Sequence, residues 1–555
     1  MAALISYQVA SRTNPARGPG IELWPRMVPW VQFFLDNYRF LQTLMTHIWL
    51  LRHDELYATL MLFCHCVGTE HPQNMSLMVS TPGFRVLAVR AWYSQAGKDI
   101  VLDSNDYFAM AVCDVFADGE GISLDEVIEG SDGDLDNFAK LLVRQCDPLI
   151  RRHSGSANPL TSKTRFRILR LVISTVVGLS RSASALLYPA LVRHGYVKTL
   201  TMVMYAFLEL PRASLRDLPP FEWDHVKAGV SQLDHLFFLR RAGHELQSSL
   251  EAGLLDVLLC CAQADVSDTI HLGSLCAIIA EFLTPSTVYR GVLITMGLAE
   301  SKTTVSRVIY HEETKKVWTN FTEILARRLA VLNLFDAPGR ITQRACDNFE
   351  CTIIQAKRDL RRCSGCHTAF YCSRECQIGH WNAGHREGCS WHVQRRKSLR
   401  LMCTPKEYAF LRFLLRHDWQ SHSAAVAVDY VKTQISNPQA TLLALFDYAQ
   451  GHRAFEIQHC VLGGTQHETE DGMEFDVPVF QQVARSGGRM TLAVMRLGNG
   501  DKSWTMWLPV RRASPEIPEA LKAIVALGDS LTEAEVQEQV EEVMRKEPPN
   551  DLIHV

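Results

Sequence analysis

The sequence lacks a long apolar run, a leader pattern and a net charge of one sign. Its most apolar stretch, 168–192, is interrupted by Arg181, short of the roughly 18 residues that a membrane span needs. Met1–Arg12 has no basic region followed by an apolar core, so we expect no secretory signal. The formal net charge of −3 gives no global attraction to nucleic acid or to anionic membranes. We therefore expect a soluble protein with no membrane partner.

Familiar catalytic motifs are absent as well. The sequence has no glycine-rich phosphate loop, no Gly-x-Ser-x-Gly elbow and no His-Glu-x-x-His pair. We predict that the protein is not an enzyme. The alternative is chemistry in the C-terminal part, which a carboxylate or histidine with a shifted pKa near Asp447, His459 or Asp476 would favour.

Hydrophobic periodicity predicts a mainly α protein whose regions differ in secondary structure. Residues 1–27 are rich in proline and glycine and have no periodic pattern, so we expect them to be irregular. From 28 to 335, apolar residues recur at helical spacing, as at Ile168, Leu171 and Val172, and strand patterns are nearly absent. The prediction is an all-helical domain, either a bundle or an armadillo-like array, and no repeat period decides between them.

The C-terminal part, 400–555, has a mixed pattern that predicts an α+β region. Two strands are expected around a Gly-Asn-Gly-Asp turn, at Met490–Leu497 and Ser503–Val510. Asn437 is predicted to cap the N-terminus of a helix that starts at Pro438. The predicted helices are Pro405–His417, Pro438–Ala449, Pro518–Leu527 and Thr532–Arg545.

Cysteine is concentrated in one place, because seven of the sixteen cysteines fall between Cys346 and Cys389. With one histidine they make eight candidate metal ligands, enough for two tetrahedral zinc ions with no open coordination position, so both zinc ions would be structural. Clustered ligand cysteines indicate a reducing, intracellular compartment and not a disulfide framework. The candidates are Cys346, Cys351, Cys363, Cys366, Cys372, Cys376, His385 and Cys389.

The ligand spacings suit zinc but leave the pairing open. Cys363-Ser-Gly-Cys366 predicts a tight turn, and Cys372-x3-Cys376 and His385-x3-Cys389 are i, i+4 pairs that would share a helix face. A sequential scheme and an interleaved scheme both fit these spacings. His380 is a rival ligand.

Basic residues are in excess around the cysteines. Between Arg340 and Arg400 there are twelve Lys/Arg and five Asp/Glu. We interpret this excess as an offset to the thiolate charge that helps keep the sulfurs ionised. It is also the basis of a weaker hypothesis, nucleic-acid binding, which predicts steep salt dependence.

The string from Cys363 to Cys389, with Tyr-Cys-Ser-x-x-Cys-Gln, a tryptophan four residues later and a His-x3-Cys ending, resembles the second half of a MYND finger. The resemblance covers 346–389, and the rest resembles fungal proteins that join this finger to a long helical region. It implies interleaved sites, with Cys346, Cys351, Cys372 and Cys376 in one and Cys363, Cys366, His385 and Cys389 in the other. One departure is the first pair, Cys346-x4-Cys351, which is usually Cys-x2-Cys.

The resemblance also implies a function, the binding of other proteins through a groove for short proline-rich peptides. Ser364, Gln377 and Trp381 match the positions that line this groove. The alternatives are that Trp381 is a core residue covering a zinc site and that Gln377 is an ordinary helix-surface residue. Some MYND fingers lie within SET-type lysine methyltransferases, but the Asn-His-Ser-Cys string of that class is absent. We expect a zinc-binding interaction module on a helical scaffold, nuclear or cytoplasmic, with a divergent methyltransferase as the alternative.

Overall fold

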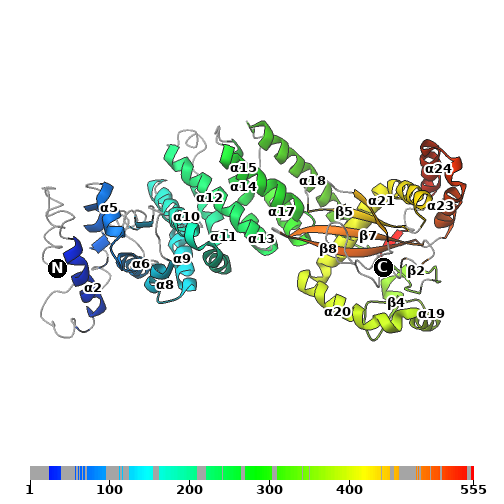
Figure 1. The fold of residues 1–555 in the computed structure, drawn as a ribbon, viewed down its shortest axis with the longest axis horizontal. Helices are drawn as coiled ribbons and strands as arrows, with labels where there is room; N and C mark the ends of the chain where they lie inside the picture. Colours follow the sequence, from blue (N-terminus) through cyan, green and yellow to red (C-terminus); the bar gives the residue numbers. More distant parts are fainter. Residues whose placement is uncertain are drawn as a thin grey trace. The chain divides into compact units, whose positions relative to one another are not determined.

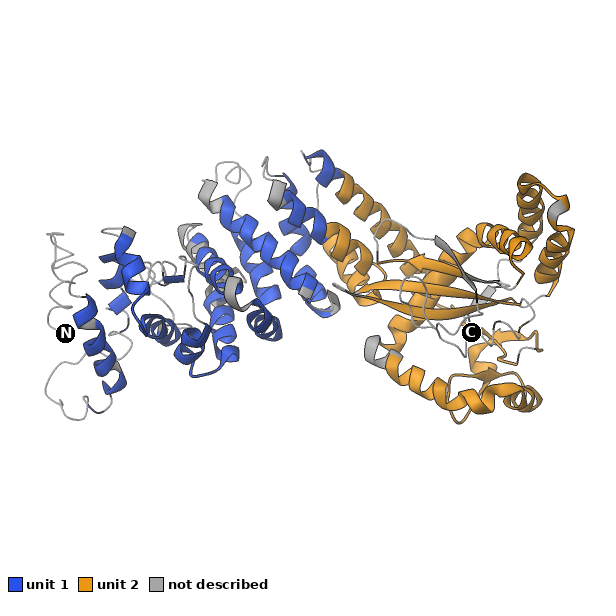
Figure 2. Ribbon diagram, viewed as in Figure 1, with its two compact units in different colours: residues 1–278, 302–315 blue, residues 279–301, 316–555 orange. Residues whose placement is uncertain are grey.

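The structure is a computed structural model of the 555-residue chain (Figure 1). It describes residues 24–38, 40, 57, 60, 61, 63–65, 67, 68, 72–95, 112, 115, 116, 124–153, 162–208, 220–239, 242–263, 269–302, 309, 311–340, 342–348, 350–438, 440–449, 456–461, 483, 486, 489–499, 502–512, 515–546 and 552–554. The chain forms two compact units (Figure 2): unit 1 is Met1–Ile278 with Lys302–Lys315, and unit 2 is Ile279–Ser301 with Lys316–Val555. The domain boundaries 1–27, 28–335, 346–389 and 400–555 remain predictions, because one compact unit can hold several of them.

Unit 1 is helical over the residues described, as the periodicity predicted. Helices close in sequence pack together, as α10 does with α9, α11 and α12, which both predicted architectures allow. The first helix among its described residues begins at Trp24, so the expectation of irregular structure through residue 27 is wrong for the last four residues, where Pro25 fits the first turn of a helix. The helices are α2 (Trp24–Asp36), α5 (Pro72–Val79), α6 (Phe84–Gln95), α8 (Leu124–Gly130), α9 (Leu135–His153), α10 (Ser162–Arg193), α11 (Tyr196–Leu208), α12 (Pro220–Leu239), α13 (Ala242–Glu251), α14 (Leu254–Gln263) and α15 (Thr269–Ala277).

Unit 2 contains a five-stranded sheet in the order β6-β5-β7-β8-β9. Its strands are antiparallel neighbours except β5 and β7, which are parallel. The predicted hairpin is confirmed: β7 and β8 pair along their length, with Leu497 opposite Trp504. The strands are β5 (Ala440–Asp447), β6 (Glu456–Val461), β7 (Met490–Asn499), β8 (Lys502–Arg512) and β9 (Leu552–His554).

The helix predicted over Pro438–Ala449 is wrong, because these residues form β5. Leu443 to Phe446 are all buried, since this strand has a sheet neighbour on each side. A continuous Leu/Ala-rich run fits a buried central strand as well as a helix, and tertiary packing decides. Asn437 therefore ends the preceding helix, where its N–H donates to the Thr433 carbonyl, and caps no new one.

Helices pack on this sheet in unit 2, and α21 (Pro405–Ser436) contacts β5, β6 and β9. The two predicted C-terminal helices are confirmed, and Thr532 caps the second in a capping box with Glu535. Both pack on α21 through a cluster that includes Val431, Leu521 and Val540. The helices are η3 (Ile278–Leu283), α16 (Thr284–Ser286), α17 (Arg290–Lys302), α18 (Glu312–Asp336), α21 (Pro405–Ser436), α23 (Glu516–Leu527), η6 (Gly528–Ser530) and α24 (Glu533–Arg545).

Two further properties concern the described residues of both units. None of their helices combines the length and the apolar composition required to cross a membrane. None of the thirteen cysteines whose side chains the structure describes forms a disulfide bond.

Candidate metal centre

The cysteine-rich segment forms a small module in unit 2. Its core is mostly cysteine, with Ala369 and Tyr371 added. Such a core buries too little apolar surface to fold the segment, so metal binding and folding are coupled here. The elements are β1 (Gln343–Ala345) paired with β2 (Ile354–Ala356), η4 (Lys357–Asp359), β3 (Arg361–Arg362) paired with β4 (Phe370–Tyr371), α19 (Arg374–His380), η5 (Trp381–His385) and α20 (Arg386–Met402).

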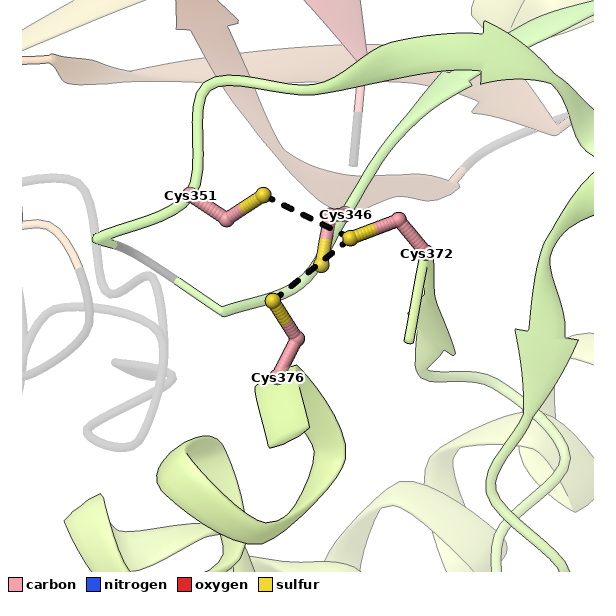
Figure 3. A group of neighbouring side chains, drawn as sticks. All are labelled: Cys346, Cys351, Cys372 and Cys376. Atoms are coloured by element: carbon pink, nitrogen blue, oxygen red, sulfur yellow. Dashed lines mark hydrogen bonds between the residues drawn. The ribbon is translucent and has the colours of Figure 1, made fainter. Parts of the chain in front are cut away.

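The eight predicted ligands form two clusters, and the pairing is interleaved. In each cluster the ligand atoms all lie within 4.8 Å of one another. The sequential scheme is therefore wrong. Site 1 is Cys346, Cys351, Cys372 and Cys376 (Figure 3), and site 2 is Cys363, Cys366, His385 and Cys389.

Site 1 has the geometry of a four-sulfur zinc site. The Cys372 sulfur lies 3.6 Å from that of Cys351 and 3.5 Å from that of Cys376, and all four side chains point toward one another (Figure 3). Four sulfurs about 2.3 Å from a tetrahedral zinc lie about 3.8 Å apart. The site therefore fits zinc, with only a small outward movement of the sulfurs.

The segment Cys346–Cys351, here called the first knuckle, is longer than the family pattern, but both of its cysteines still lie in site 1. Asn348 shapes the extra length: its side-chain oxygen accepts from the Glu350 N–H at 3.3 Å and its carbonyl accepts from the Cys351 N–H at 3.0 Å. The Ile353 N–H then donates to the Cys351 sulfur at 3.5 Å. The departure from Cys-x2-Cys is thus absorbed by a turn.

Arg511 of β8 holds the same knuckle from outside the module. Its guanidinium donates to the backbone carbonyls of Cys346, Asn348 (3.0 Å) and Cys351. Arg511 is only 2% exposed, so these carbonyls have a buried donor in place of water. Nothing in the sequence around Arg511 marks this role.

Cys372 does not lie on a helix with Cys376, contrary to the prediction. Ser373 has an extended backbone and caps α19, its hydroxyl accepting from the Cys376 N–H at 3.2 Å. Serine is a preferred N-cap residue, so the helix starts after it, and Cys372 lies between β4 and the cap. Both sulfurs reach site 1 because the chain turns at the cap.

Site 2 combines three sulfurs with one imidazole nitrogen. His385 Nε2 lies 3.4 Å from the Cys363 sulfur and 3.6 Å from that of Cys366, and the Cys389 sulfur is 3.9 Å from that of Cys363. The predicted Cys-Ser-Gly-Cys turn is present, and a Cβ on Gly365 would lie only 2.9 Å from the Cys389 sulfur. Glycine is therefore required there by close approach.

A break in the helix brings His385 into site 2. Gly384 lies within η5 and has φ 123°, a value that side chains strongly disfavour, so the chain kinks there between α19 and α20. His385 follows the break, one helical turn before Cys389. The rival ligand His380 is in neither cluster; it is buried and its Nδ1 lies 3.1 Å from the Tyr371 hydroxyl.

The electrostatics of the two clusters call for a cation. Burial raises the pKa of Cys346, and that of Cys372 and Cys389 to about 11. Burial opposes ionisation of Cys366 too, but hydrogen bonds, first that with His385, lower its pKa to about 5. Without a positive ion Cys346, Cys372 and Cys389 would thus be protonated, and zinc binding would displace their protons.

The predicted peptide-binding residues lie on the surface side of the module. Ser364 is exposed in the site 2 turn, Gln377 is half-buried on α19, and Trp381 is 37% exposed with its ring 5.8 Å from that of His385. Trp381 thus both contacts a zinc ligand and faces solvent. Ile378, one helical turn before Trp381 and 52% exposed, was missed from the sequence.

Of the residues singled out for an enzyme alternative, Asp447 is the one whose side chain the structure describes. Asp447 is buried, and its carboxylate accepts from Arg496 (3.2 Å) and from the Ala449 N–H (2.8 Å), as a structural ion pair does. The His459 side chain and Asp476 lie outside the described residues.

Comparison with known proteins identifies the module. A search of curated proteins found no match at the level we required, and neither did a search of solved structures. Residues 346–389, which hold all eight ligands of the two interleaved clusters, match the family model described as MYND finger.

Proposed function

We propose that the protein acts by binding and not by catalysis, with the MYND finger recruiting proline-rich segments of other proteins in the cell. MYND fingers are zinc-binding modules of protein interaction, and this coarser function follows from the match and the two clusters. The finer proposal is supported by one observation: Trp381 and Ile378, large apolar side chains one turn apart, are exposed beside the zinc-held core.

The chemistry of this surface suits proline. An indole face packs well on prolines, which are already extended and lose little entropy on binding. Half-buried Gln377 and exposed Ser364 provide polar groups that can bond a peptide backbone. Zinc would be structural in this function, because each cluster already supplies four ligands.

The test is titration of the zinc-loaded full chain with a panel of fluorescein-labelled proline-rich decapeptides, read by anisotropy. Trp381→Ala should weaken binding about tenfold or more, as loss of a central aromatic residue does. Trp30→Ala is the matched control, because Trp30 is also exposed but lies in unit 1. Both variants should keep two zinc ions per chain, one for each cluster.

The outcomes separate the competing ideas. If the parent binds no peptide of the panel, the proline-rich ligand class is wrong. If Trp381→Ala binds as the parent does, the surface is wrong. Steep loss of peptide affinity with salt would indicate charge-driven binding, whereas contact through an indole predicts weak dependence.

A further inference from the structure

A cavity in unit 2 lies apart from both cysteine clusters, between the finger, α20 and the start of α21. Its volume is about 290 Å³. Among the described residues that line it, Asp347 is the one carboxylate. Six cationic side chains line the same space, namely Arg344, Lys357, Arg362, Arg395, Arg396 and Arg412.

The one carboxylate is already engaged by the finger. Asp347 accepts from the Phe370 N–H at 2.6 Å, and its nearest approach to Arg344 is 4.0 Å. One carboxylate in this position offsets at most one of the six positive charges. The walls therefore leave a strong positive potential inside the cavity.

Three of the cations gather around a single buried ring. The centroid of Phe370 lies 4.1 Å from the Arg344 guanidinium carbon, 5.3 Å from that of Arg362 and 5.5 Å from the Lys357 nitrogen. A ring face attracts each cation, but like charges so close together repel one another. Burial and then the neighbouring Arg344, Arg412 and Arg362 lower the pKa of Lys357 to about 8, as expected where positive charge is crowded.

Donor groups in the cavity wall also lack acceptors. Arg344 is only 9% exposed, and its Nε has no hydrogen-bond partner among the described residues. The buried Nε of Arg396 has none within the same set. Buried N–H groups are almost always paired, so unpaired ones on a cavity wall indicate a ligand that accepts hydrogen bonds.

We propose that this cavity binds a small polyanion that carries phosphate groups. Guanidinium groups match phosphate oxygens in pairs, and several phosphate charges are needed to balance this many cations. The volume is near the lower end of the range for small-molecule pockets, about 300 Å³, which suits a diphosphate group better than a macromolecule. The basic excess counted in the sequence thus serves an anion as well as the thiolates.

The first experiment is calorimetric titration of the zinc-loaded full chain with inorganic pyrophosphate. The parent should bind pyrophosphate at one site, and Lys357→Met combined with Arg412→Met should weaken binding about tenfold or more. Arg358→Met is the matched control, because Arg358 carries the same charge on the same η4 turn but has a side chain 82% exposed and outside the lining. The control should bind as the parent does, and all three proteins should keep their zinc.

Thermal melting adds a readout that a purely structural cation would not give. Removing two crowded charges should raise the melting temperature of the ligand-free protein, because it relieves repulsion. Pyrophosphate should raise the melting temperature of the parent and leave that of the double variant unchanged. A ligand-free double variant that melts below the parent would mean that these cations stabilise the fold, and would overturn the proposal.

Other outcomes would also overturn it. Citrate binding as tightly as pyrophosphate would show selection by charge alone. An oligonucleotide that binds more tightly through the same residues would make the site a nucleic-acid contact. If the parent does not bind pyrophosphate at all, the proposal is wrong.

Discussion

The two zinc sites of the finger differ in what holds them. Site 2 is the more buried site: three of its ligands are buried, and the turn at Gly365 and the break at Gly384 bring its ligands together. Site 1 is more exposed, with three half-buried ligands, and its first knuckle is held by Arg511 from the sheet. One site is thus a local structure, whereas the other joins the finger to the rest of unit 2.

This difference shows how a family pattern can change without loss of the site. Two additional residues in the first knuckle lengthen a loop whose carbonyls would otherwise need water or a local partner. Here the sheet supplies a buried guanidinium instead. The longer knuckle therefore depends on its contact with the sheet, which supplies the donor for its carbonyls.

Loss of a zinc ligand should have the largest effect and should differ between the sites. Cys372→Ser should lower the zinc content from two ions to one, because site 2 stays complete. Cys363→Ser should lower it below one, because the site 2 ligands lie on both sides of the β4–α19 segment, which carries Cys372 and Cys376 to site 1. Each zinc ion contributes apparent binding energy of about 10–16 kcal/mol in small fingers. Metal analysis of the purified proteins measures the number of zinc ions per chain. If both variants lose the same amount of zinc, site 1 does not depend on site 2 more than site 2 depends on site 1.

Arg511→Met should come next and act on site 1 alone. Three carbonyls would lose their buried donor, at a cost of about 1–3 kcal/mol, so the zinc affinity of site 1 should fall about 10–100-fold. Competition with a chromophoric chelator resolves the two sites. Arg512→Met is the control, since Arg512 is buried on the same strand but contacts Met544. If Arg511→Met and Arg512→Met weaken zinc binding at site 1 equally, Arg511 stabilises the protein in general and has no specific role at site 1.

Asp418→Asn tests whether site 1 follows the stability of unit 2 in general. Burial raises the pKa of Asp418, but hydrogen bonds from His417, Arg328 and Tyr448 and the Arg328 charge outweigh burial and lower the pKa to about 2. Relative to the ordinary 3.8, this corresponds to about 2 kcal/mol of stability. That stability is present above pH 4 and is lost as the pH falls through about 2.

Denaturant unfolding of the parent and Asp418→Asn across this pH range checks the sign. The difference between them should be full near neutrality and should shrink as the pH approaches 2. Site 1 should keep its zinc affinity at neutral pH in the variant. If Asp418→Asn lowers the zinc affinity of site 1 as much as Arg511→Met does, that affinity depends on the overall stability of unit 2 and not on the Arg511 guanidinium.

A pair of glycine substitutions should give the smallest effect and opposite signs. Gly365→Ala should weaken zinc binding at site 2 by about 1 kcal/mol, because the new methyl group would lie 2.9 Å from the Cys389 sulfur. Gly388→Ala meets nothing within 4 Å and lies within α20, so it should stabilise the protein by about 0.5–1 kcal/mol. Chelator competition and thermal melting together measure both effects. Weakened zinc binding in Gly388→Ala would show that close approach to sulfur is not the cause.

The ligand set could be predicted from sequence because it is a local matter of residue type and spacing. The pairing could not, since interleaving depends on how β4 and α19 return to the first knuckle, and only the resemblance indicated it. The position of Cys372 was predicted wrongly although Ser373, a strong N-cap residue, was there to mark the helix start. The helix prediction over Pro438–Ala449 was wrong because Leu and Ala have high helix propensity. Burial of this run within the sheet outweighs that local preference.

Long-range partners carried no local signal. Arg511 lies 160 residues after Cys351, and an arginine in a strand is usually a surface residue. The basic excess around the cysteines was counted correctly but was interpreted as an offset to thiolate charge and, more weakly, as a nucleic-acid contact. The cavity brings these cations together with Arg412, which comes from α21. Charge counts along the chain do not reveal which charges share a cavity.

The dependence of site 1 on Arg511 also has a consequence for biosynthesis. A ribosome makes the chain from the N-terminus, so every ligand of both sites emerges well before β8. Site 2 has what it needs at that moment and can take up zinc on the nascent chain. The knuckle of site 1 lacks its guanidinium donor until Arg511 is synthesised, 160 residues after Cys351. A truncated chain that ends before β8 would therefore leave the ribosome with site 2 complete and site 1 without this support.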